Sequence, residues 1–193
     1  MMRRMINRYM YMGYGLPGDV LDVDSSGIDA LSFSFFDGMV FMYFEADTEV
    51  NPHDIAGAKL ASFPTGERWR RMFDIFHSSV PRDGEHWRRK LDGKKPWIRV
   101  NRLKPEMIAS YIFYHFQYQE ERPGEGDKYE VIFLCGNLMV MYQERPIEHE
   151  ENPAPPGLDT KNTPSGWGEL MNEHFIPWEN GGDCWQEIYT REI

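Results

Sequence analysis

Apolar and polar positions in the second half of the chain predict the order strand, helix, strand, strand, helix, strand. The segments 96–103 (PWIRVNRL) and 128–144 (KYEVIFLCGNLMVMYQE) are typical of strands, and a Gly-Asn turn divides the second into a hairpin. Pro105 stands at a first-turn position and opens a helix that we expect to end near Glu121. The segment 165–175 (SGWGELMNEHF) predicts the second helix. This order is that of a ferredoxin-like β-α-β-β-α-β unit.

The first half of the chain repeats several of these signals. Both 35–45 (FFDGMVFMYFE) and 133–144 (FLCGNLMVMYQE) have an apolar run, a turn with glycine, and a Met-Tyr-x-Glu ending. Three landmark pairs share one separation of 98 residues, namely Gly38 and Gly136, Trp69 and Trp167, and Trp87 and Trp185. The last pair belongs to the similar strings GEHW and GDCW, which end at these tryptophans. A common offset at three ordered landmarks predicts a tandem duplication.

The first copy differs from the second at one informative place. Its segment 65–77 (TGERWRRMFDIFH) predicts the second helix, because apolar residues recur at i, i+3, i+4 and i+7 from Trp69. Asp37-Gly38 marks its hairpin turn, and Trp87 is expected on its last strand. Where the second copy has its first helix, the first copy has 13–27 (GYGLPGDVLDVDSSG). Glycine and proline make that segment a loop or at most one helical turn.

A single ferredoxin-like unit covers only one face of its sheet with helices, so the other apolar face needs a cover. We therefore predict an α+β fold in which two tandem ferredoxin-like units, 1–92 and 97–193, pack sheet to sheet as a pseudo-dimeric α/β barrel. The charged segment 88–96 (RRKLDGKKP) is expected to link them. Because the first helix of the first unit is degenerate, one complete pocket is expected, in the second unit.

Composition and charge exclude several classes of protein. The 193 residues are 41% hydrophobic and 15% aromatic, which is enough for a sizeable core. The net charge of −10 repels phosphate backbones, so no nucleic-acid partner is expected unless the basic stretch 59–104 forms one patch. No apolar run is long enough to span a bilayer, and charged residues interrupt the N-terminal segment where a signal peptide would be apolar. We expect a soluble, cytoplasmic protein without a membrane partner.

Tyr111 and His115 are the strongest candidates for chemistry. They lie four residues apart on one face of the predicted helix, which Tyr114 and Tyr118 extend. An imidazole can act as acid or base near neutral pH, and tyrosine hydroxyls can orient sugar hydroxyls. The alternative is an aromatic helix that covers its sheet, with His115 hydrogen-bonded in the core. Likewise, Trp69 and Trp167 are either core residues or platforms for a sugar ring.

Other motifs favour ordinary structural interpretations. Asn51 followed by Pro52 resembles a helix cap with a first-turn proline. The run 148–151 (EHEE) contains metal-ligand residue types, but it precedes a proline-rich segment and is expected to be a solvated acidic loop. Cys135 and Cys184 have neither disulfide-framework nor zinc-site spacing. The sequence therefore predicts no metal and no cofactor.

Five segments together resemble a known family. In the second half they are the Tyr-x-x-x-His of Tyr111 and His115, the hairpin VIFLCGNLMVMYQE, and WQEIY; in the first half they are GIDALSFSFFDGMVFMYFEAD and ERWRRMF. The chain resembles the L-rhamnose mutarotase family, small ferredoxin-like proteins that pair into a dimeric α/β barrel. This resemblance covers most of each half.

The resemblance implies roles for individual residues. The family's proton-donating histidine falls on His115, and its substrate-contacting tyrosine falls on Tyr111. The first tryptophan of a Trp-Trp pair falls on Trp69 in one copy and Trp167 in the other; Arg70 and Gly168 replace the second. A further substrate tyrosine has no clean equivalent, because Glu130 lies in register and Tyr129 is adjacent.

The function so implied is that of a sugar mutarotase, an isomerase that interconverts the α and β anomers of L-rhamnose or a similar monosaccharide. Ring opening needs one proton delivered to the ring oxygen and another removed from the anomeric hydroxyl, without metal or cofactor. The chain would act as a monomeric pseudo-dimer or as a homodimer. One alternative is a non-enzymatic barrel that binds a small carbohydrate. The other is a cofactor-free monooxygenase or heme-handling barrel, since one fold hosts unrelated chemistries.

Overall fold

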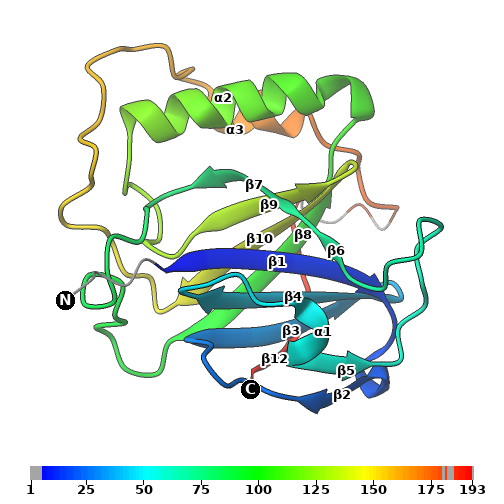
Figure 1. The fold of residues 1–193 in the computed structure, drawn as a ribbon. Helices are drawn as coiled ribbons and strands as arrows, with labels where there is room; N and C mark the ends of the chain where they lie inside the picture. The colour runs from blue at the N-terminus through cyan, green and yellow to red at the C-terminus, as the bar shows by residue number, and fades with distance from the viewer. Residues whose placement is uncertain (1–5, 180, 182–184, 193) are drawn as a thin grey trace. The chain divides into compact units, whose positions relative to one another are not determined.

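The structure, a computed structural model, describes residues 6–179, 181 and 185–192. The fold is α+β, with two five-stranded antiparallel sheets, a two-stranded sheet and few helices (Figure 1). The chain divides into two compact units. The first contains the described residues up to Met72 together with 81–89 and 188–192; the second contains 73–80 and 90–187. No helix in the described part of the chain is long and apolar enough to cross a membrane.

The sheet of the first unit has the strand order β12-β3-β4-β1-β6. Its strands are β1 (Asn7–Tyr14), β3 (Ala30–Phe36), β4 (Met39–Ala46), β6 (Arg70–Arg71) and β12 (Tyr189–Glu192). The predicted hairpin is confirmed, and Asp37 and Gly38 at its turn have φ of 48° and 71°. Positive φ at both central residues is what a tight two-residue hairpin turn requires.

One face of the first sheet packs against short elements rather than long helices. These are η1 (Pro17–Asp19), β2 (Val20–Val23), α1 (Pro52–Ile55) and β5 (Ala56–Ala58), of which β2 and β5 pair with each other. The segment 13–27 contains a single helical turn, which agrees with the prediction, but it also forms the strand β2, which the sequence did not predict. The Asn51 cap is also confirmed, because its side-chain oxygen accepts a hydrogen bond from the backbone N–H of His53 at 3.1 Å.

The second unit follows the predicted order more closely. Its sheet runs β11-β8-β10-β9-β7, from β7 (Phe73–His77), β8 (Lys95–Arg102), β9 (Val131–Cys135), β10 (Leu138–Arg145) and β11 (Gln186–Glu187). After the short η2 (Pro105–Met107), the helix α2 (Ile108–Glu121) packs with α3 (Trp167–Asn172) on one face of this sheet (Figure 1). The strand near 96–103, the second hairpin and both helices are therefore confirmed.

Two predicted elements of the first half are wrong. The segment 65–77 is not a helix but contributes β6 and β7, which are edge strands and pair with β1 and β9. Sheet edges offer unpaired backbone groups, and these outweigh a helical periodicity that is only a weak preference. Trp87 lies in a turn, where its N–H donates to the Asp83 carbonyl at 3.0 Å, rather than on a strand.

The boundaries between the units also differ from the two sequence halves 1–92 and 97–193. Residues 73–80 belong to the second unit, and 188–192 belong to the first, where β12 pairs with β3. Each sheet is therefore completed at one edge by a strand from the other half of the chain. The repeat match at 182–184, with Cys184, lies outside the described residues.

Candidate functional site

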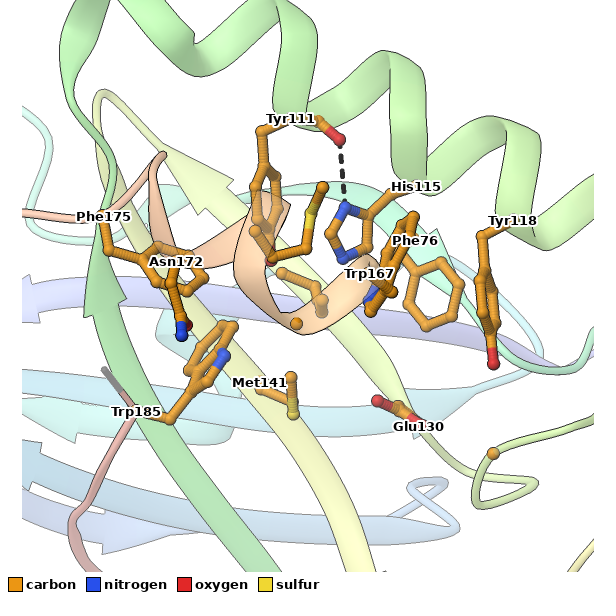
Figure 2. A pocket seen from close by; sticks show the side chains of 14 residues that line it. Phe76, Tyr111, His115, Tyr118, Glu130, Met141, Trp167, Asn172, Phe175 and Trp185 are labelled. Carbon is orange, nitrogen blue, oxygen red and sulfur yellow. Dashed lines mark hydrogen bonds between the residues drawn. The ribbon is translucent and has the colours of Figure 1, made fainter. Parts of the chain in front are cut away.

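A cavity of about 300 Å³ lies in the second unit, between α2, α3 and the sheet (Figure 2). Its apolar lining consists mainly of Phe76, Ile132, Met141, Trp167, Met171, Phe175 and Trp185. Its polar side chains are Tyr111, His115, Tyr118, Glu130 and Asn172. Apolar walls with a few convergent polar groups are typical of small-molecule sites.

Four of the six residues predicted for the site line this cavity: Tyr111, His115, Glu130 and Trp167. Trp69 instead packs in the core of the first unit with Tyr9, Tyr11 and Leu60, and is 4% exposed. It lies on no helix, so its predicted equivalence to Trp167 is wrong. Its assignment as a core residue, the alternative raised from the sequence, agrees with this placement.

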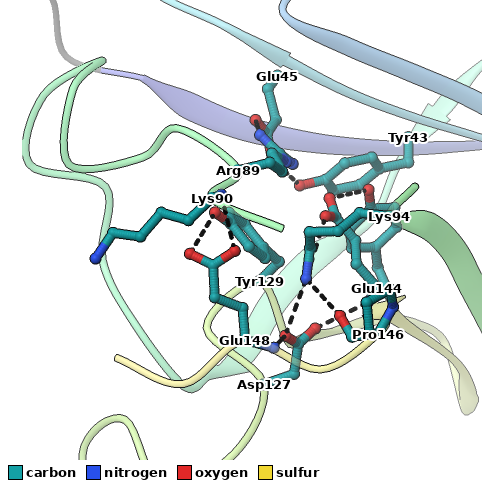
Figure 3. Close-up of polar contacts among 11 residues, drawn as sticks. Tyr43, Glu45, Arg89, Lys90, Lys94, Asp127, Tyr129, Glu144, Pro146 and Glu148 are labelled. Atoms are coloured by element: carbon teal, nitrogen blue, oxygen red, sulfur yellow. Dashed lines mark hydrogen bonds and ion pairs between the residues drawn. The ribbon is translucent and has the colours of Figure 1, made fainter. Parts of the chain in front are cut away.

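Tyr129 is fully buried but does not line the cavity. Side chains alternate between the two faces of a strand, and Ile132 on β9 faces the cavity. Glu130, directly before β9, therefore shares the face of Ile132, whereas Tyr129 lies in the preceding turn and points away from the cavity. There its hydroxyl donates to the Glu148 carboxylate at 3.4 Å (Figure 3).

The tyrosine and glutamate of the repeated Met-Tyr-x-Glu motif form polar clusters outside this cavity, although Met141 of the second copy lines it. In the first unit the Tyr43 hydroxyl donates to Glu45 at 2.7 Å, and Glu45 forms two bonds with Arg89 at 2.7 and 2.8 Å (Figure 3). In the second unit the Tyr142 hydroxyl donates to Glu144 at 2.8 Å. The repeated spacing of the motif thus has a structural explanation: in each copy the tyrosine hydroxyl donates a hydrogen bond to a buried glutamate carboxylate.

The acidic run 148–151 was expected to be a solvated loop, but it is only partly solvated. Glu148 is buried, and its carboxylate accepts the backbone N–H of Lys90 at 3.1 Å. The Nδ1 of His149 hydrogen-bonds to the Gly126 carbonyl at 3.1 Å. Among the described residues, no three His, Cys, Asp or Glu side chains gather as metal ligands would.

His115 is held in one tautomer by its own helix. Its Nδ1–H donates to the Tyr111 carbonyl at 3.0 Å, and the two rings stack with their centroids 4.0 Å apart (Figure 2). Trp167 and Phe76 pack edge-on against the imidazole at 4.9 and 5.3 Å. Burial, together with the nearby His174, lowers the pKa of His115 to about 4. At neutral pH the ring is therefore uncharged and offers a lone pair at Nε2 rather than a proton.

Glu130 has the opposite kind of shift. Burial raises the pKa of its carboxyl to about 7, against the hydrogen bond from Gln143 and the charge of Arg99, which lower it. A Cβ on Gly126 would lie 2.3 Å from Glu130 Oε2, so a larger residue there would displace the carboxylate. Near neutral pH, Glu130 populates both its acid and its base form, which suits a group that transfers protons.

Two tyrosines add hydroxyl groups to the cavity lining. Burial, reinforced by the charge of Glu130, raises the pKa of Tyr111, which therefore stays protonated. Burial and the nearby Glu125 also raise the pKa of Tyr118, whose hydroxyl donates to Glu125 at 3.2 Å. Both side chains are neutral hydrogen-bonding groups for a ligand.

The loop before α3 fixes the position of Trp167. The Glu121 carboxylate, at the end of α2, accepts bonds from Thr160 Oγ1 at 2.7 Å, Asn162 N at 2.7 Å and Thr163 N at 2.9 Å. These bonds, Thr163 first, lower the pKa of Glu121 to about 2. The loop is thereby tied to α2 a few residues before Trp167 begins α3 and packs on His115.

The first unit has no counterpart of this polar site. The paired registers of the two hairpins match Leu31 to Glu130 and Phe44 to Gln143, both with a separation of 99 residues. Leu31 and Phe44 belong to the apolar core. The first unit therefore has an apolar side chain, Leu31, at the position that corresponds to the titratable carboxyl of Glu130.

Sequence reasoning missed several lining residues. Phe76 was assigned to a helix, and its place in the cavity depends on the pairing of β7 with β9. Trp185 also lines the cavity, whereas the sequence marks it only as a repeat landmark and as the start of WQEIY, with no role in a site. Met141 could have been found, because it alternates with Met139 and Gln143 on one face of β10.

The chain was compared with known proteins at three levels. No protein-family model matches it, and no curated protein matches it. Among solved structures, it is similar to one described as "Crystal structure study of anthrone oxidase-like protein". That likeness has a TM-score of 0.36 and 10% identity, and it covers 98% of this chain and 93% of the other. A similarity at this level supports no conclusion on fold or function, so the function has to be argued from the site itself.

Proposed function

We propose that the protein is a sugar mutarotase of the aldose 1-epimerase type, acting on L-rhamnose or a similar monosaccharide in the cavity of the second unit. The observation that supports this best is the pairing of His115, a neutral proton acceptor, with Glu130, a carboxyl whose pKa is about 7, in one lining. The cavity volume of about 300 Å³ lies at the small end of ligand sites, which suits a single sugar ring.

The reaction needs two proton transfers in opposite directions. His115 Nε2 accepts the proton of the anomeric hydroxyl while protonated Glu130 donates its proton to the ring oxygen. The bond between the anomeric carbon and the ring oxygen breaks, which yields the open-chain aldehyde. After rotation about the adjacent carbon–carbon bond, the ring closes on the other face and both protons return. Neither residue is consumed, and the chemistry requires no cofactor.

Aromatic side chains would hold the sugar between these groups. Trp167 provides an apolar ring face, and Tyr111, Tyr118 and Asn172 provide hydrogen-bonding groups around it. The pseudo-dimeric α/β barrel belongs to this proposal. It is supported by strands such as β10, whose successive residues Met139–Glu144 are all buried, because a strand with apolar residues on both faces has to be covered on both.

A second candidate is a cofactor-free monooxygenase-like activity. The mostly aromatic and methionine lining favours it, since such walls suit a planar aromatic substrate. In that case His115 would deprotonate a phenol or enol rather than an anomeric hydroxyl.

Saturation-transfer and exchange NMR on a panel of free monosaccharides, L-rhamnose included, tests the proposal. Accelerated exchange between anomers supports the mutarotase. Binding without faster exchange indicates a carbohydrate-binding module. If there is neither binding nor faster exchange, both sugar hypotheses are contradicted and the oxygenase-like candidate is left.

A His115→Ala variant then tests the catalytic assignment. Loss of a positioned acid–base group slows the reaction by about 10²–10⁴-fold. His115→Gln, which retains more of the side-chain volume, should show a similar loss with less effect on packing. His53→Ala is the matched control, because it removes an exposed imidazole from the first unit. An unchanged rate in folded His115 variants would defeat the assignment.

A further inference from the structure

Three polar side chains lie in a row on the cavity face of the second sheet. In the β9–β10 register Val131 pairs with Tyr142, so one further step places Glu130 opposite Gln143. Arg99 on β8 pairs with Met141 and is therefore the diagonal neighbour of Gln143 on the same face. The row runs from Arg99 on β8 across Gln143 on β10 to the titratable carboxyl of Glu130, directly before β9.

Hydrogen bonds connect the three side chains, with Arg99 as donor to Gln143 and Gln143 as donor to Glu130. Arg99 Nη2 donates to Gln143 Oε1 and lies 2.7 Å from Met141 Sδ. Gln143 in turn hydrogen-bonds to the Glu130 carboxylate. A guanidinium can only donate, so it takes the amide oxygen of Gln143 and leaves the amide NH₂ to face Glu130. The amide orientation of this buried glutamine is therefore determined by its neighbours.

Arg99 is itself held in place. Its guanidinium carbon lies 3.7 Å from the centroid of the Trp97 ring, in cation–π geometry. Its Nε is buried and has no hydrogen-bond partner among the described residues, so the side chain forgoes a bond in order to sit there. A buried donor without a partner costs free energy, so the other contacts of the guanidinium have to offset that cost.

We propose that Gln143, oriented by Arg99, is a positioning residue for Glu130: it donates a hydrogen bond that favours the ionised carboxylate and directs that carboxylate at the cavity. This inference rests on the proton-transfer role proposed for Glu130. In the first unit Phe44 and Tyr11 occupy the positions of Gln143 and Arg99, so the device belongs to the second unit alone.

Other groups act on Glu130 as well. Arg99 favours its ionised form, whereas Asp127, in the turn before β9, opposes that form by its charge and favours it by a backbone hydrogen bond. From α2, Tyr111 and Tyr118 interact electrostatically with Glu130. Of these side chains, only the amide of Gln143 acts on Glu130 through a side-chain hydrogen bond: Arg99 acts on it by charge, Asp127 by charge and by its backbone, and the two tyrosines remain protonated.

The experiment is a ¹³C NMR titration of the Glu130 carboxyl in the whole protein labelled at glutamate. In the wild type we expect a pKa near 7. Gln143→Leu should raise it by about one pH unit or more, because a hydrogen bond to the charged form is lost. Gln143→Asn, which is polar but too short to bridge Arg99 and Glu130, should also raise it and serves if the leucine variant fails to fold. Met139→Leu, a core change on the same strand, is the control and should leave the titration unchanged.

The pH profile of anomer exchange should move with the titration, which a purely structural role of Gln143 would not cause. An unchanged pKa of Glu130 in a folded Gln143 variant overturns the inference. The titration needs no substrate, so absence of anomer exchange in the wild type would count against the proposed function without deciding this point.

Discussion

Replacing Glu130 with glutamine should stabilise the protein at alkaline pH while removing its proposed activity. The carboxyl has an ordinary pKa of 4.5, which burial raises to about 7 in the folded state. Ionisation is therefore less favourable in the folded chain than in the unfolded chain. Below pH 4.5 the carboxyl is protonated in both states, so the free energy of unfolding is unaffected. Between pH 4.5 and 7 the free energy of unfolding falls as the unfolded chain ionises, and above pH 7 it stays lower by the full cost. At 1.36 kcal/mol per pH unit this cost is about 3 kcal/mol.

Glu130→Gln has no carboxyl to ionise, so it should regain most of that free energy at pH 8 and almost none at pH 4.5. Thermal unfolding at the two pH values measures this, since 1 kcal/mol corresponds to about 2–4 °C in Tm for a chain of this size. Glu125→Gln is the control, because it removes an equal charge from an exposed side chain. A change in Tm that is the same at both pH values, or destabilisation at pH 8, would refute the reasoning.

Tyr111→Phe keeps the ring but deletes the hydroxyl, so sugar binding should weaken about tenfold, the effect of roughly one hydrogen bond, with far-ultraviolet circular dichroism unchanged; unaltered affinity in a titration would remove Tyr111 from the binding site. Glu121→Ala should release the loop that leads to Trp167, so trypsin should cut after the exposed Lys161 faster than in the wild type and sugar affinity should fall. Equal rates of cleavage would show that these bonds do not hold the loop. Because the polar site has no counterpart in the first unit, calorimetry should give one monosaccharide per chain, and two equal sites would contradict this.

Local patterns were sufficient for much of the second unit. The hairpin around Gly136, the helix that begins at Pro105, and the common face of Tyr111 and His115 depend on short-range periodicity and turn chemistry, which the chain specifies within a few residues. Alternation along β9, extended back by one residue, places Glu130 on the face of Ile132 toward the cavity, whereas Tyr129 in the preceding turn does not line it.

Contacts between distant segments decided the rest. The segment around Trp69 has a helical spacing of apolar residues, yet it became strands because two sheet edges offered hydrogen bonds to its backbone, and no local pattern encodes that competition. The shifts of His115 to about 4 and of Glu130 to about 7 likewise depend on burial, which arises only when α2, α3 and the sheet enclose one cavity. The residues that can transfer protons were visible in the chain, but their protonation states come from the packing around them, because desolvation is a property of the assembled fold.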